Sequence, residues 1–528
     1  MAIEKEAAMG QQEVQYKDIH TIMSEQARLH PSKIYIESPD QRRNITFEQT
    51  NAMCNRIANF FKERGLKAND RVTLVAENSI ETLLIYFSAL KYGAVINPLN
   101  IEESKENIYS MINRARPKIV FYGQELALDH TKYKADMWIP FTALTAENKE
   151  ESEFFASLKH YSPVFQFPVA AKDDLSTHLF TSGTTGIPKA VVWTREALFY
   201  MPVEIIDRFK MTDKDIVLDY RAYSWSSPQV LSILPTMVSG ATLVFGRRFS
   251  RTRFASWLKD YGITICVGIP TVINFLLEEA VPLHKRDVPS LRFMTSSSAP
   301  LLVKNQLKFE EKYGIPINQL AGSTETGFMG LGDPEDLKVP EKRRFGTIGK
   351  VPRYKEVLIL DEQGNRLKPG EDGEIVVKGL STALGYVDDD GVVSKFPEEG
   401  FRTGDLGRVD NDGYLYITGR KKELVKRGGV LISPQEITNW LMGHPDVQEA
   451  TTIGVPDRVY GEDIASFVVL KEGHQVTKEA LLDYCKKKIP DFKLPKTLYF
   501  VKELPRTPSG KIARVEVLKL WEEMQPKA

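Results

Sequence analysis

Cysteine is scarce in this sequence: Cys54, Cys266 and Cys485 are the only three, and they lie far apart with no Cys-x-x-Cys pair. This usage excludes a disulfide framework and a paired-cysteine metal site, and it favours a reducing compartment. We interpret each cysteine as a small buried hydrophobic residue.

An excess of charge of one sign is also missing, because 70 Lys and Arg residues balance 70 Asp and Glu residues. A balanced chain has no global electrostatic attraction for nucleic acid, although local patches stay open. Long apolar runs are lacking as well: the best one, residues 82–89, is followed by Lys91 and falls short of the about 18 residues that a membrane span needs. The N-terminus has no apolar signal segment. We therefore expect a cytoplasmic protein.

The sequence does contain repeated pairs of a helix and a strand. Apolar residues at helical spacing alternate with short β-branched runs at four places, namely 47–64 with 71–76, 81–92 with 94–98, 253–261 with 263–267, and 303–313 with the run from 315. Such alternation predicts α/β layers around mostly parallel sheets.

The pattern changes in the last third of the chain. Between about 340 and 420, short strands alternate with Asp, Gly and Pro turns, which predicts a β-rich subdomain. After residue 420 the chain returns to a compact α+β pattern. We expect a large N-terminal domain over 1–420 and a small C-terminal domain over 421–528.

Residues 180–189 read Phe-Thr-Ser-Gly-Thr-Thr-Gly-Ile-Pro-Lys and carry the strongest chemical signal. The glycines let the backbone approach an anion, and the hydroxyls and free N–H groups suit phosphate oxygens. The terminal Gly-Lys-Ser/Thr of a Walker loop is missing. From composition alone a flexible linker is the more frequent outcome, but the whole string is far more specific. It resembles the phosphate-binding loop of the adenylate-forming superfamily, which includes acyl-CoA synthetases, non-ribosomal adenylation domains and luciferases.

Further segments resemble the same superfamily in the same order along the chain. They are Ala321-Gly-Ser-Thr-Glu325, Gly385-Tyr386, Phe401-Arg-Thr-Gly-Asp-Leu406, the run from Gly419 to Lys426, and Pro505-Arg-Thr-Pro-Ser-Gly-Lys511. The resemblance covers essentially the whole chain and implies a layered α/β adenylation domain followed by a mobile C-terminal domain.

The resemblance also implies roles for individual residues. Nucleotide phosphates would lie on Thr181, Ser182, Gly183, Thr184, Thr185, Gly186, Lys189, Gly322, Ser323 and Thr324. Glu325 would hold Mg²⁺ through hard oxygen ligation. Asp405 and Arg420 would bind the ribose, Lys511 would be the catalytic lysine, and Lys422 would be the hinge. Coenzyme A would pass along Lys426, Gly428 and Gly429.

The implied reaction has two steps. A carboxylate attacks the α-phosphate of ATP to give an acyl-adenylate and pyrophosphate, and a thiolate then releases AMP. Because both first-step reactants are anions, neutralising and positioning charge is most of the catalytic task.

The sequence departs from the superfamily pattern around the adenine and acyl sites. Ala321 replaces an aromatic residue that packs on adenine, Trp225 falls where a His is common, Ser297 and Ser298 replace two glycines, and Leu431 replaces an Asn. These changes indicate a specialised pocket more than an inactive enzyme.

The acyl pocket is predicted to include Tyr223, Trp225, Ser296, Ser297, Ser298 and Met329. Bulky aromatic residues would close a long tunnel, so a short, medium, aromatic or polar acid is favoured over a long-chain fatty acid. The pattern is also similar to the carnitine and crotonobetaine CoA ligases. We expect an ATP-dependent carboxylic acid–CoA ligase, with a homodimer as the default assembly.

Three other functions stay open at this point. The chain could load an amino or other acid onto a carrier protein, although Asp219, the nearest acidic residue for an ammonium group, is out of register. Luciferase-like oxygenation is a rarer exception. A nucleotide-binding regulator without turnover would fit Ala321 and Leu431.

Overall fold

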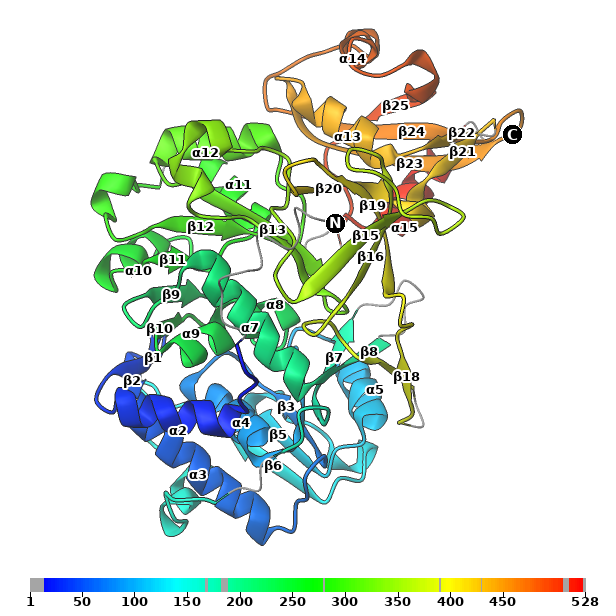
Figure 1. Cartoon of the computed structure of the whole chain (residues 1–528). Coiled ribbons are helices and arrows are strands. Elements are labelled where there is room, and N and C mark those ends of the chain that lie inside the picture. The colour runs from blue at the N-terminus through cyan, green and yellow to red at the C-terminus, as the bar shows by residue number, and fades with distance from the viewer. Residues whose placement is uncertain are drawn as a thin grey trace.

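The structure of the protein is a computed structural model that describes residues 14–166, 170–181, 189–278, 281–388, 391–428, 430–506 and 512–525. In these ranges the chain forms four β-sheets, two of them large, with helices packed around them (Figure 1). The predicted α/β architecture with a β-rich subdomain and a separate C-terminal unit is confirmed.

The first large sheet is mostly parallel. Its strand order is β14 (Gly327–Leu331), β13 (Ile317–Ser323), β12 (Phe293–Ser296), β11 (Ile265–Cys266), β9 (Ile216–Asp219), β10 (Thr242–Phe245), β1 (Ile34–Ser38) and β2 (Arg43–Thr46). Neighbouring strands from β13 to β1 pair in parallel, whereas β14 and β2 are antiparallel edge strands. The carboxyl ends of five parallel strands, β9 to β13, therefore lie along one edge.

The second large sheet lies beside the first. Its order is β18 (Val393–Lys395), β17 (Gly385–Val387), β8 (Lys189–Thr194), β7 (Leu175–Thr181), β4 (Val95–Leu99), β3 (Arg71–Val75), β5 (Ile119–Gly123) and β6 (Met137–Phe141). Strands β7, β4, β3, β5 and β6 are parallel, and β8 returns antiparallel to β7.

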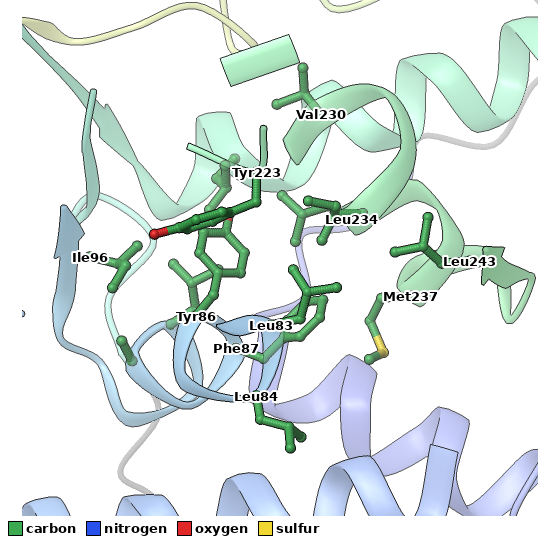
Figure 2. Packing of buried hydrophobic residues seen from close by; sticks show 14 of the residues in the cluster. Leu83, Leu84, Tyr86, Phe87, Ile96, Tyr223, Val230, Leu234, Met237 and Leu243 are labelled. Atoms are coloured by element: carbon green, nitrogen blue, oxygen red, sulfur yellow. The ribbon is translucent and has the colours of Figure 1, made fainter. Parts of the chain in front are cut away.

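Helix α4 (Ile80–Tyr92) fills the space between the two large sheets. It begins at the Ser79 side chain, which caps the amide of Thr82, and ends at Gly93 in the left-handed conformation (φ 93°). Every residue from Ile80 to Lys91 is buried. Complete burial is expected for a helix with apolar residues on all its sides. Figure 2 shows Leu83, Tyr86 and Phe87 of this helix packed with Tyr223 and Leu234 in the shared core.

The remaining helices cover the sheets and loops. They are α2 (Ile19–Leu29), α3 (Phe47–Glu63), α5 (Lys105–Ala115), α6 (Glu153–Ser157), α7 (Arg195–Phe209), α8 (Ser226–Pro228), α9 (Leu234–Ser239), α10 (Phe254–Asp260), α11 (Pro270–Glu278), α12 (Val303–Tyr313), α13 (Pro434–Gly443), α14 (Lys478–Lys486) and α15 (Arg514–Glu523). A π-helical segment, η4 (Gln229–Ile233), joins α8 to α9. None of the helices in the described ranges is long and apolar enough to cross a bilayer.

Two smaller sheets follow in sequence. The first is antiparallel, with order β15 (Lys355–Leu360), β16 (Gly373–Gly379), β19 (Phe401–Val409) and β20 (Leu415–Arg420). The second contains β22 (Val430–Ile432), β21 (Val425–Arg427), β24 (Gly461–Leu470), β23 (Val447–Asp457) and β25 (Thr497–Phe500), and it has its own apolar core. In Figure 1 this last unit stands at one end of the molecule, next to the β15–β20 sheet.

Candidate functional site

Several of the described site residues lie where strand ends from three sheets meet. The loops after β9, β10, β11 and β12 and the turn after β13 lie at one edge, because these strands are parallel. Crevices at the carboxyl ends of parallel strands are the usual ligand sites of open α/β sheets. Most of the residues that the sequence singled out after these strands belong to this edge.

The base of the predicted phosphate loop faces the Glu325 segment. Thr181 and Lys189 are opposite each other in the β7–β8 pair, so they are adjacent in space although eight positions apart in sequence. Strand β17 pairs with β8 and brings Tyr386 beside it. The Lys189 ammonium lies 5.0 Å from the centre of the Tyr386 ring, within cation–π range. The Tyr386 hydroxyl donates a 2.9 Å hydrogen bond to Glu325 Oε1.

The β13–β14 turn holds Glu325 and Thr324 in place. The Ser323 amide donates to Thr326 Oγ1 at 3.1 Å and the Thr326 amide donates to Ser323 Oγ at 3.2 Å, which closes the turn. A Cβ on Gly322 would lie 1.9 Å from the Gly327 carbonyl oxygen, so this position admits only glycine. The Thr324 hydroxyl lies 3.3 Å from Ser226 Oγ, which links the turn to the loop after β9.

Asp405 and Arg420 form a pair on the small antiparallel sheet. They are opposite each other on β19 and β20, and Arg420 Nε lies 2.5 Å from Asp405 Oδ1. Burial raises the pKa of Asp405 to about 6, while Arg420 opposes the rise. The charge of Glu325 adds to the rise in this pKa, so the two carboxylates share one electrostatic neighbourhood. The pair thus lies within electrostatic reach of Glu325.

A buried ionic network behind Glu325 was not predicted. Lys355 Nζ donates to Glu204 Oε2 at 2.7 Å and to Ser381 Oγ at 2.6 Å, and Ser381 Oγ donates to Glu204 Oε1 at 2.7 Å. The Lys355 and Glu204 side chains are 0% and 2% exposed. The network ties α7 and β15 to the segment that precedes β17. Two residues after Ser381, the Ala383 amide donates to the Glu325 carbonyl oxygen at 2.9 Å.

The predicted hinge and acceptor residues lie after β20. Lys422 is exposed on a short 3-10 turn, while its neighbours are paired: Lys421 with Glu374 at 2.9 Å and Glu423 with Arg514 at 2.8 Å. Lys426 is exposed and its amide donates to Glu462 Oε2 at 2.7 Å. Gly428 has φ +56°, a left-handed conformation that glycine favours.

The serine residues of the predicted acyl pocket lie at the end of β12. Ser296 and Ser297 are 1% and 2% exposed, and neither hydroxyl has a hydrogen-bond partner in the described part of the chain. The hydroxyl of Ser224, which follows β9, is also buried without a hydrogen-bond partner in the described part of the chain. Ser298 is exposed and has φ +73°, an uncommon conformation for a residue other than glycine. The sequence analysis did not single out Ser224, although it lies between Tyr223 and Trp225, which it did single out.

The other predicted pocket residues are in different surroundings. Tyr223 is 1% exposed, its hydroxyl donates to the Leu74 carbonyl at 2.7 Å, and its ring lies in the core beside α4 (Figure 2). Trp225 is half-buried at the start of α8. Met329 belongs to the core under the β15–β20 sheet, so the fold does not bring its side chain together with Tyr223 in one apolar cluster.

Seven of the predicted site residues lie outside the described residues: Ser182, Gly183, Thr184, Thr185, Gly186, Gly429 and Lys511. Their roles stay predictions. Among the described residues, no group of three His, Cys, Asp or Glu side chains could hold a metal ion by itself. Glu325 offers a hard carboxylate oxygen of the kind that Mg²⁺ accepts.

Comparison with known proteins gives two family matches. The AMP-binding enzyme family matches residues 23–387, and the AMP-binding enzyme C-terminal domain matches residues 436–511. The chain belongs to the AMP-binding enzyme family, whose members form adenylates.

Individual relatives agree with this assignment. A sulfoacetate–CoA ligase of Cupriavidus necator is 30% identical over 95% of this chain and 98% of its own length. An oxalate–CoA ligase of Arabidopsis thaliana is 31% identical over 89% of this chain and 92% of its own. The crystal structure of ATP-bound MatB from Rhodopseudomonas palustris superposes with a TM-score of 0.84 at 27% identity, covering 96% of this chain and all of MatB.

The chain is an AMP-forming carboxylic acid–CoA ligase. ATP and CoA are its co-substrates, and the predicted reaction class is confirmed.

Proposed function

We propose that this ligase activates a short acid that carries a second polar or anionic group. The observation that carries the proposal is the set of buried, unpartnered hydroxyls of Ser224, Ser296 and Ser297 at the ends of β9 and β12. Burying a hydroxyl without a hydrogen-bond partner costs about 1–3 kcal/mol of folding free energy. A bound acid with a second polar group would supply the partner that the described residues do not. Strands β9 and β12 are two positions apart, about 10 Å, which suits one small ligand between them.

The packing of Tyr223 supports a short acid. Its ring occupies the space between the loop after β9 and α4, and its hydroxyl is fixed on the β3 backbone. An extended acyl chain directed between the two large sheets would have to displace this ring. The relatives named for sulfoacetate and oxalate act on two-carbon acids with a second acidic group, in agreement with the proposal.

The first step is assigned as follows. Thr181, Lys189 and Thr324 position the phosphates. Glu325 would hold Mg²⁺, which would neutralise phosphate charge. Asp405 and Arg420 bind the ribose hydroxyls. With the anions held together, a carboxylate oxygen attacks the α-phosphorus and pyrophosphate leaves. Lys511 offsets the repulsion between the two reactants; its role rests on the sequence motif alone.

The second step uses the unit after Arg420. We propose that residues 421–528 move as a domain about Lys422 and bring Lys426, Gly428 and Gly429 to the acyl-adenylate. The CoA thiolate attacks the acyl carbon, AMP leaves, and the thioester forms. We also propose that the protein is cytoplasmic and that it forms a homodimer.

The test is an ATP/Mg²⁺ assay with oxalate, sulfoacetate, malonate, acetate, benzoate and octanoate, following pyrophosphate and AMP with and without CoA. We expect a kcat/KM at least tenfold higher for the best two-group acid than for acetate or octanoate. In Ser297→Ala this preference falls about fivefold, because one hydroxyl partner of the ligand is lost. The exposed Ser110→Ala, on α5, is the matched control. A preference for octanoate would overturn the proposal, and pyrophosphate release without a thioester would indicate a carrier-protein acceptor.

A further inference from the structure

A small cavity lies beneath the N-terminal segment and has no role in the chemistry described so far. Residues 16–18 pass over it, and helices α2, α4, α7 and α9 supply most of the remaining wall. Its volume is about 30 Å³, which leaves room for two water molecules or one small ion, since a water needs about 10–15 Å³. Much of the wall is apolar, with side chains that include Ile22, Leu198, Leu234 and Val238.

Arg195, at the start of α7, brings a buried positive charge to this wall. The residue is 6% exposed. Its Nη1 and Nη2 donate to the carbonyl oxygens of Leu90 and Ala94 at 2.9 and 3.4 Å, whereas its Nε has no hydrogen-bond partner in the described part of the chain. Among the described residues, no carboxylate oxygen lies within 4.0 Å of the guanidinium. A buried cation without a counter-ion in contact is costly, so an anion beside it would be stabilised.

The Tyr16 hydroxyl is a second unsatisfied group of the wall. It is buried and has no hydrogen-bond partner in the ranges that the structure describes. Burial raises the pKa of Tyr16 to about 12, so the hydroxyl keeps its proton and can donate it. The Tyr16 ring packs edge-on against Phe199 of α7, with 5.5 Å between the ring centres. Two donors from different segments of the chain therefore line one cavity.

The other two charged groups of the wall already have partners. The Lys17 ammonium is half exposed and pairs with Glu25 at 2.7 Å. Asp18 is the N-cap of α2 and accepts a 2.9 Å hydrogen bond from the Thr21 amide. Burial lowers the pKa of Arg195 by more than the surrounding groups, Asp18 among them, raise it. Asp18 therefore does not take the place of a counter-ion in contact with the guanidinium.

We propose that this cavity binds one monovalent anion of the size of chloride between Arg195 and Tyr16. The guanidinium Nε–H and the phenol hydroxyl would donate to the anion, and the apolar wall would keep water away from it. The carboxylates and phosphates of the substrates are too large for this volume. The bound anion would join the N-terminal segment to α7 and stabilise the folded chain. The inference is independent of the acid that is activated and of the acceptor.

The first test follows thermal unfolding at constant ionic strength, while chloride replaces gluconate, an anion too large for the cavity. For the parent we expect the midpoint to rise by about 2 °C between about 1 and about 200 mM chloride. In Tyr16→Phe, the chloride concentration that gives half of the rise should increase about tenfold, because a hydrogen bond to a charged group is lost. The matched control is Tyr460→Phe, which removes the hydroxyl of a residue that is 48% exposed and should respond as the parent does.

The second test is a crystal structure of the parent grown in sodium bromide. Bromide takes the place of chloride and is located by its anomalous scattering, so a peak is expected between Arg195 and Tyr16. A cavity that holds only water in these crystals would overturn the proposal, as would equal chloride responses of Tyr16→Phe and the parent. Arg195→Met should lose the response altogether. If this variant does not fold, Tyr16→Phe and the bromide structure still decide.

Discussion

The Tyr386 hydroxyl donates a 2.9 Å hydrogen bond to the Glu325 carboxylate, joining β17 of one large sheet to the β13–β14 turn of the other across 61 positions of sequence. This contact orients the side chain that we assign to Mg²⁺. It also links that side chain to Lys189, because the lysine ammonium lies over the same tyrosine ring.

Removing the hydroxyl should weaken the first step. In Tyr386→Phe we expect kcat/KM for ATP to fall about tenfold, because a hydrogen bond to a charged group is lost. The Mg²⁺ concentration for half-maximal pyrophosphate release should rise in parallel. Tyr354→Phe is the control, since the Tyr354 hydroxyl is buried without a hydrogen-bond partner in the described ranges. Equal Mg²⁺ dependence in Tyr386→Phe and the parent would contradict the assignment.

The raised pKa of Asp405 predicts a pH-dependent stability difference. The folded protein binds a proton here with a pKa of about 6, against an ordinary value of 3.8, so its contribution to stability is full below pH 3.8 and is lost as the pH rises through 6. Asp405→Asn keeps a neutral group at all pH values. Its thermal midpoint relative to the parent should therefore be more favourable at pH 8 than at pH 5.

Thermal unfolding of both proteins between pH 5 and 8 tests this expectation. The exposed Asp483→Asn is the control and should show a constant difference. At pH 8, Asp405→Asn should also bind AMP more weakly, which would show that the carboxylate is retained for the nucleotide at a cost in stability. A difference in midpoint that does not vary with pH would refute the account.

The network of Glu204 and Lys355 should show strong coupling. Because both side chains are buried, Lys355→Met leaves an unpaired carboxylate and should cost about 3–5 kcal/mol of unfolding free energy. The double variant Glu204→Met/Lys355→Met should cost less than Lys355→Met alone. Denaturant unfolding of the parent, the two single variants and the double variant measures the coupling. Additive losses would indicate that the two residues act independently.

Lys304 connects the N-terminal domain to the unit after Arg420. Its ammonium, on α12, donates to the carbonyl oxygens of Met442 and His444 at 2.8 and 3.2 Å, at the C-terminal end of α13. A cation at a helix C-terminus is favourable by up to about 2 kcal/mol when it is partly buried. Loss of this contact should allow the C-terminal unit to leave its present position more often.

Trypsin cleavage near Lys421 and Lys422 should therefore be several-fold faster in Lys304→Met than in the parent. Lys308→Met removes an exposed lysine from the same helix and is the control. Equal cleavage rates in the two variants would mean that Lys304 does not hold the arrangement.

The sequence predicted the local elements well. The expected helix at 303–313 matches α12, and those at 47–64 and 81–92 match α3 and α4 to within one residue. Periodicity and the capping residues Thr46 and Ser79 are local signals, so they can be recognised without knowledge of the fold.

Contacts between residues far apart in the sequence could not be predicted from the sequence alone. Glu204 and Lys355 are 151 positions apart, and each looks like an ordinary surface charge in its own segment. No local pattern indicates that the Tyr223 ring packs beside α4. The proposed site depends on the resemblance for residue roles, while the fold shows which of those residues lie together.

The described residues that we assign to the nucleotide come from three sheets: Lys189 from one, Glu325 from the turn between two strands of another, and Asp405 with Arg420 from a third. During synthesis these strands leave the ribosome in that order. On the proposed assignment of Asp405 and Arg420 to the ribose, a nascent chain that ends before residue 420 has no complete place for ATP. On this assignment, ATP binding requires that the β15–β20 sheet has formed, even though the loops after β7 and β13 are made much earlier.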